Sequence, residues 1–266
     1  MSSFWCSAWS ILLAISWLLP NHYRPWVSFH MDAWIAISML VAGYVVYIRN
    51  AAPVVLHRIT LLFSTMVCIP WMQYVFGQVH LLGSVWISSI YLYGLFLSVI
   101  VGTRWEVMKP GQPCDALFLA IGVASVISVG LQLQQWLQID GIELWKMGGG
   151  SERPHANFGQ PNLLGTFLLW GLLAVGGGWN RRHIGWVVAL LMSAFIVVGI
   201  SLTGSRTAWI GIFLVFLLSW IWRGLWRSRY FPILVTCLCV FFALCVVNQS
   251  SVKSLVTGED ALAMHG

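Results

Sequence analysis

The chain has 266 residues, of which 59% are hydrophobic and only 8% are charged, and its mean hydropathy is +0.83. A soluble domain carries roughly a quarter charged residues, so this composition excludes an ordinary soluble protein and predicts an all-α polytopic integral membrane protein. The net charge of +6 does not indicate nucleic-acid binding, because Lys and Arg of membrane proteins gather in cytoplasmic loops.

The apolar runs set the number of expected membrane spans. A bilayer core about 30 Å thick needs roughly 20 mostly apolar residues per helix. The first run has no charged region before it and no small-residue cleavage site after it, so we interpret it as a membrane helix and not as a signal peptide. On these rules the sequence predicts about nine transmembrane helices, at residues 4–19, 33–48, 59–76, 83–101, 114–136, 161–179, 184–202, 207–222 and 231–248.

The distribution of basic residues predicts the orientation of these helices. With the N-terminus in the cytoplasm, nine of the 14 Lys and Arg residues fall in cytoplasmic loops, and the C-terminus is periplasmic. We therefore expect a multi-span membrane domain at 1–248 and the start of a periplasmic loop at 249–266. The cytoplasmic set is Arg49, Arg58, Arg104, Lys109, Arg181, Arg182, Arg223, Arg227 and Arg229.

The stretch RPHANFGQPNLLGTFLL, residues 153–169, is polar in its first half and apolar in its second. Pro is tolerated at the first position of a helix, so a helix is predicted to begin at Pro161 with its N-terminus facing outward. Free N–H groups and the positive end of the helix dipole can hold an anion there. The polar side chains that crowd this end are Arg153, His155, Asn157, Gln160 and Asn162.

A second polar cluster, Thr203-Gly204-Ser205-Arg206-Thr207, lies between two predicted spans on the same side of the membrane. Ser205 or Thr203 can cap the following helix, and the planar guanidinium of Arg206 matches phosphate oxygens. Two outward-facing helix starts, each with an Arg, favour a pyrophosphate site. The simpler alternatives are a juxtamembrane anchor for the Arg and ordinary helix caps for the amides.

Other cofactor chemistry has no signature in the sequence. The six Cys residues show no zinc spacing and no disulfide framework, and they are interpreted as small buried hydrophobic residues. No Walker loop, dinucleotide fingerprint or HExxH motif is present. We therefore expect no metal and no cofactor.

Several stretches resemble a known family. RPHANFGQPNLLGTFLLWG is similar to the signature of bacterial pilin-type O-oligosaccharyltransferases, members of the O-antigen ligase and polymerase superfamily. PNHYRPWVSFHMD resembles the first outer loop of that family, and IPWMQYVFGQV resembles its third span. SLTGSRTAWIG resembles the start of the ligase region, which would begin near residue 185.

The resemblance implies a multi-pass protein of the bacterial inner membrane with its active face in the periplasm. Such enzymes transfer a glycan en bloc from undecaprenyl-pyrophosphate to a Ser or Thr hydroxyl of a periplasmic protein such as pilin, without a metal. By this likeness Arg206 and Gln160 are the catalytic candidates: Arg206 would hold the departing pyrophosphate, and Gln160 would help to bind donor or acceptor. The candidate substrate-binding residues are Arg153, His155, Asn157, Asn162 and Ser205.

The chain also differs from the family that it resembles. Family members continue with a large periplasmic loop, which carries a functional His, and with further helices, whereas this chain ends at Gly266. We therefore expect the N-terminal part of a truncated transferase, whose activity by itself the resemblance does not imply. Two alternatives stay open: an O-antigen ligase or polymerase acting on lipid A core or glycan, and a non-catalytic membrane subunit or transporter.

Overall fold

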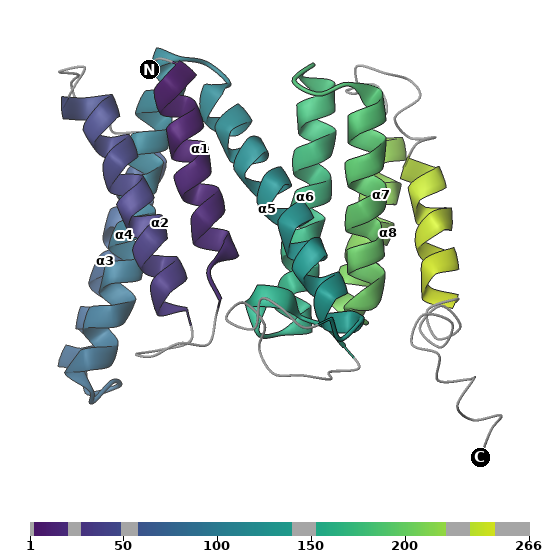
Figure 1. Cartoon of the computed structure of the whole chain (residues 1–266). Coiled ribbons are helices and arrows are strands. Elements are labelled where there is room, and N and C mark those ends of the chain that lie inside the picture. The colour runs from purple at the N-terminus through teal and green to yellow at the C-terminus, as the bar shows by residue number, and fades with distance from the viewer. Residues whose placement is uncertain (1–2, 21–27, 49–57, 140–152, 222–234, 248–266) are drawn as a thin grey trace. The chain divides into compact units, whose positions relative to one another are not determined.

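The computed structural model describes residues 3–20, 28–48, 58–139, 153–221 and 235–247 (Figure 1). Every regular element in these ranges is a helix or a helical turn, and none is a strand. This agrees with the predicted all-α class, and a helix occupies each of the nine predicted apolar ranges. The periplasmic loop predicted at 249–266 lies outside the described residues, as do Arg49, Arg223, Arg227 and Arg229.

The chain divides into two units, and each is described by itself. The first contains Met1–Leu12 and Ala33–Ala116, and the second contains Leu13–Asp32 and Leu117–Gly266. Because the boundaries fall inside elements, helices α1, α2 and α5 each contribute residues to both units.

In the first unit, long apolar helices pack through aromatic rings and a few hydrogen bonds to carbonyl groups. The rings of Trp9 and Trp105 meet edge to face with centroids 5.1 Å apart. The hydroxyl of Tyr47 donates to the carbonyl of Ile100 at 3.1 Å. The helices of this unit are α1 (Ser3–Leu18), α2 (Phe29–Gly43), the π-helical turn η1 (Tyr44–Ile48), α3 (Arg58–Val75) and α4 (Leu82–Met108).

In the second unit, helices α6, α7 and α8 run side by side (Figure 1). Consecutive helices of this group run in opposite directions, so the start of α6, the end of α7 and the start of α8 lie at one end of the unit. The elements of this unit are α5 (Gln112–Trp136), the 3₁₀ turn η3 (Ala156–Phe158), α6 (Pro161–Asn180), α7 (Trp186–Leu202), α8 (Arg206–Ile221) and the helix Val235–Val247.

Glycines allow these helices to approach closely. A Cβ built on Gly171 of α6 would lie 2.6 Å from the Cβ of Ser125 in α5, closer than real Cβ atoms come. A Cβ built on Gly199 of α7 would lie 2.5 Å from Val129 of the same helix α5. Small residues serve this purpose in membrane proteins, where backbone proximity replaces the hydrophobic drive for helix association.

The helix lengths bear on the predicted topology. Four helices are long and apolar enough to cross a membrane, namely Phe29–Ile48, Leu82–Met108, Gln112–Trp136 and Pro161–Asn180. Other apolar helices in the described ranges are shorter, so nine spans and their orientation stay predictions. The largest difference in bounds is at α4, which was expected to end at residue 101 and continues to Met108. The helix continues because the first residues that break it are Pro110 and Gly111.

Candidate functional site

The first part of the candidate site is the start of α6. Gly159 has a φ of 67°, which lets the chain turn from η3 into the helix. Gln160 is the N-cap, with extended backbone, and Pro161 is the first helical residue, as predicted. The Gln160 side chain is exposed and makes no capping hydrogen bond, so its amide group is available to a ligand. The first N–H groups of the helix have no acceptor within it.

The second part is the turn between α7 and α8. The Thr203 hydroxyl donates to the carbonyl of Ile200 at 2.7 Å and accepts the Ser205 N–H at 3.2 Å. Gly204 lies between them with a φ of 56°. The Ser205 hydroxyl accepts the N–H of Ala208 at 3.4 Å, so Ser205 caps α8 as predicted.

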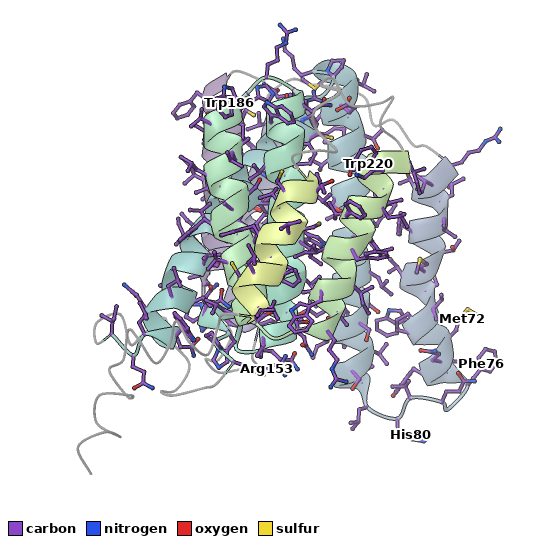
Figure 2. The ribbon with its side chains drawn as sticks, turned by 90° about the vertical axis from the view of Figure 1, so that its right-hand side faces the viewer. Met72, Phe76, His80, Arg153, Trp186 and Trp220 are labelled. Carbon is purple, nitrogen blue, oxygen red and sulfur yellow. The ribbon has the colours of Figure 1, made fainter. Side chains whose placement is uncertain are left out.

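These two parts lie in direct contact. A Cβ built on Gly165, in the second turn of α6, would lie 3.2 Å from the Cβ of Ser205 and 2.9 Å from that of Ala208. The guanidinium of Arg153 joins them at the surface, since it donates to the turn and to Asn162 of α6. Figure 2 shows Arg153 at the opposite end of this unit from Trp186, where α7 begins. The two predicted polar clusters are therefore brought together.

Arg206 gives this end of the unit its available positive charge. It is the first residue of α8 and is exposed. Its guanidinium has no hydrogen-bond or ion-pair partner within the described parts of the chain. The sequence from Arg153 to Ile221 contains no Asp or Glu, so no carboxylate from α6, α7 or α8 can neutralise it. An exposed Arg that has no carboxylate partner among the described residues and lies beside two helix N-termini suits an anion.

Two predicted site residues are buried instead of exposed. Asn157 is fully buried, and its side-chain NH₂ donates to the carbonyl of Trp17 at 2.7 Å. Ser205 is fully buried as the cap of α8. His155 is half-buried at the start of η3. The exposed members of the predicted set are thus Arg153, Gln160, Asn162 and Arg206.

Two glutamines of α5 support the site, and the sequence did not assign them a role. The side-chain oxygen of Gln135 accepts the N–H groups of His155 and Ala156, at 2.8 and 2.9 Å. The NH₂ of Gln132 donates to the carbonyls of Gly199 at 3.0 Å and Pro154 at 3.3 Å. The sequence feature that could have indicated this role is the polar run LQLQQWLQ at the end of an otherwise apolar helix.

The donor set of the site favours anion binding over metal chemistry. Its exposed side chains are guanidinium and amide groups, which donate hydrogen bonds to phosphate oxygens. In the described ranges no group of three or more His, Cys, Asp or Glu side chains is placed to hold a metal ion. The geometry therefore supports recognition of a phosphate-bearing ligand at the joined starts of α6 and α8.

The chain is similar in sequence to a curated protein. The chain is 32% identical over 222 residues to a "General O-oligosaccharyltransferase" of Acinetobacter baylyi. The match covers 82% of this chain and 38% of that protein, so the chain spans well under half the length of this relative. No protein-family profile matches the chain, and no solved structure matches it. The relationship confirms the resemblance that the sequence motifs indicated.

Proposed function

We propose that this chain, as a protein of the O-oligosaccharyltransferase type, holds the donor site of an enzyme that glycosylates proteins. The donor is a glycan on undecaprenyl-pyrophosphate, and the acceptor is a Ser or Thr hydroxyl of a periplasmic protein such as pilin. The site faces the periplasm from the inner membrane. The observation that carries the proposal is the exposed Arg206 at the joined starts of α6 and α8, which has no carboxylate partner among the described residues.

The reaction explains why such a site is needed. The acceptor oxygen bonds to the first sugar carbon and loses its hydroxyl proton, while the bond from that carbon to the pyrophosphate oxygen breaks and its electron pair stays on the pyrophosphate. The proton released by the hydroxyl balances the charge of the products. Negative charge therefore grows on the pyrophosphate as the reaction proceeds, and fixed donors aimed at it stabilise the transition state. Arg206 supplies the charge, and the helix starts supply N–H groups.

Gln160 and Asn162 suit the neutral parts of the substrates. Both side chains are exposed at the start of α6, beside the turn that carries Arg206. An amide group offers both donors and an acceptor, so either residue can recognise sugar hydroxyls or the acceptor backbone. His155, Asn157 and Ser205 then maintain the shape of the site through their backbone and buried contacts.

A transfer assay tests the proposal. The chain is expressed in cells that make a lipid-linked oligosaccharide and a pilin, with or without the unmatched remainder of the Acinetobacter relative, and the pilin mass is measured. We expect a mass increase equal to the glycan in at least one setting. Arg206→Ala should abolish it, whereas Arg182→Ala, at the other end of α6, should not.

Each other result of this assay has a definite meaning. Absence of transfer in both settings would overturn the proposed reaction. Transfer that persists in Arg206→Ala would remove Arg206 from it. Glycan found on lipid A core, with none on protein, would replace the proposed acceptor by that of an O-antigen ligase.

A further inference from the structure

We infer that Arg153 is a positioning residue, which holds the α7–α8 turn so that Arg206 and the start of α8 are presented to the ligand. This assigns Arg153 a different role from the direct substrate contact that the sequence suggested. The inference rests on the proposed pyrophosphate site, and its test separates the two.

The contacts of Arg153 are directed at the turn. Its Nε donates to the carbonyl of Thr203 at 3.0 Å, and its Nη2 donates to the carbonyl of Gly204 at 3.1 Å. The same Nη2 lies 3.4 Å from the side-chain oxygen of Asn162 in α6. One guanidinium thus ties the start of α6 to two successive carbonyls after α7.

These carbonyls would otherwise disfavour the proposed ligand. The end of a helix leaves carbonyl groups without partners and carries partial negative charge. The end of α7 lies beside the starts of α6 and α8, so its carbonyls lie near the proposed anion site. Arg153 satisfies two of them with charge-assisted hydrogen bonds. Arg206, two residues after Gly204, is exposed and has no partner among the described residues.

Gly204 is fitted to this arrangement. Its φ of 56° lies in the left-handed region that favours glycine. A Cβ built on it would lie 3.1 Å from the Nε of Arg153. A side chain at Gly204 would therefore strain the backbone and displace the guanidinium while leaving every charge in place. Arg206 follows only two residues later, so a shift of the turn moves the first residue of α8.

A double-mutant cycle on donor binding tests the inference. Purified full-length chain in lipid nanodiscs is titrated with undecaprenyl pyrophosphate, as wild type, Arg153→Ala, Arg206→Ala and the double variant. We expect Arg206→Ala to weaken binding about tenfold or more, and Arg153→Ala about fivefold or more, as for charged hydrogen-bonding groups. In the Arg206→Ala background, Arg153→Ala should weaken binding by less than about twofold, because the effects of coupled residues are not additive.

Two further variants serve as comparisons: Gly204→Ala disturbs the turn without removing a charge, and Arg182→Ala removes an exposed Arg at the other end of α6. Gly204→Ala should weaken binding as Arg153→Ala does, although it removes no charge, and Arg182→Ala should leave binding unchanged. Hydrogen exchange without ligand gives a second measurement: Arg153→Ala should speed exchange at Ala208 and Trp209, whose N–H groups bond to Ser205. Arg153→Lys, which restores charge without the planar fork, should rescue binding only in part.

The outcomes distinguish a failure of the positioning role of Arg153 from a failure of the proposed pyrophosphate site. If the costs of Arg153→Ala and Arg206→Ala multiply, or if Gly204→Ala binds normally, Arg153 contacts the ligand directly and the positioning role is wrong. If exchange is unchanged in Arg153→Ala, the positioning role is wrong as well. If Arg206→Ala binds undecaprenyl pyrophosphate as tightly as wild type, the proposed pyrophosphate site fails, whatever Arg153 does.

Discussion

At the scale of single residues, Gln135 shows how a polar side chain builds this site without touching a ligand. One carbonyl oxygen accepts two adjacent backbone N–H groups, those of His155 and Ala156, and Gln135 is itself 4% exposed. Unsatisfied buried N–H groups are costly. The polar segment before α6 therefore depends on α5 for its backbone hydrogen bonds.

We predict that Gln135→Leu destabilises the protein by about 2–4 kcal/mol, because the buried N–H of Ala156 and the part-buried N–H of His155 lose their acceptor. Thermal unfolding in detergent, followed by tryptophan fluorescence, measures the change. Gln134→Leu is the control, since the side-chain oxygen of Gln134 is buried without a partner among the described residues. Gln134→Leu should leave the thermal stability of the protein unchanged or raise it slightly. An equal loss in both variants would contradict the role given to Gln135.

The sequence could predict the local features of these residues but not their distant partners. The helix start at Pro161 and a cap at Thr203 or Ser205 were predicted, and the structure has Pro161 and Ser205 in these places, because a helix start and a cap depend on neighbours a few residues away. The sequence predicted a substrate-binding role for Asn157, but it could not show whether the side chain faces solvent or a neighbouring helix, because a polar residue near a helix start looks the same in both cases. Its partner, the carbonyl of Trp17, is 140 residues away in the chain.

At the scale of elements, close helix contact through glycine determines where the starts of α6 and α8 lie. Gly165 brings α6 against the first turn of α8, and Gly171 brings α6 against α5. The helices themselves could be predicted from apolar runs, since their length follows from bilayer thickness. Which glycine faces which helix could not, because nearly every face of these helices is apolar and no hydrophobic stripe marks the contact.

We predict that Gly171→Ala destabilises the protein by about 1–3 kcal/mol, because its methyl group would overlap Ser125 and force α5 and α6 apart. Gly130→Ala in α5 is the matched control, because a Cβ there meets no atom within 4 Å. That change should be neutral or stabilise by up to about 1 kcal/mol through helix propensity. Unfolding by denaturant in mixed micelles measures both, and a neutral Gly171→Ala would show that the α5–α6 contact is looser than described.

At the scale of the whole molecule, the topology rests on the basic residues. The nine predicted spans would place the joined starts of α6 and α8 in the periplasm, the side that the proposed reaction requires. A phosphatase that is active only in the periplasm, fused after Gly266, should therefore be active. A fluorescent protein that matures only in the cytoplasm, fused at the same point, should be dark. The reverse pair of signals would contradict the odd number of spans.

The joined starts of α6 and α8 are proposed to bind the pyrophosphate of a lipid-linked donor. The most direct measurement of this binding is crosslinking of purified chain with a photoreactive undecaprenyl pyrophosphate that carries its reactive group beside the phosphates, followed by peptide mass mapping. We predict labelling within residues 153–170 and 203–215, with strong loss in Arg206→Ala and none in Arg182→Ala. Labelling centred on Arg181–His183, or labelling that is unchanged in Arg206→Ala, would contradict pyrophosphate binding at the starts of α6 and α8.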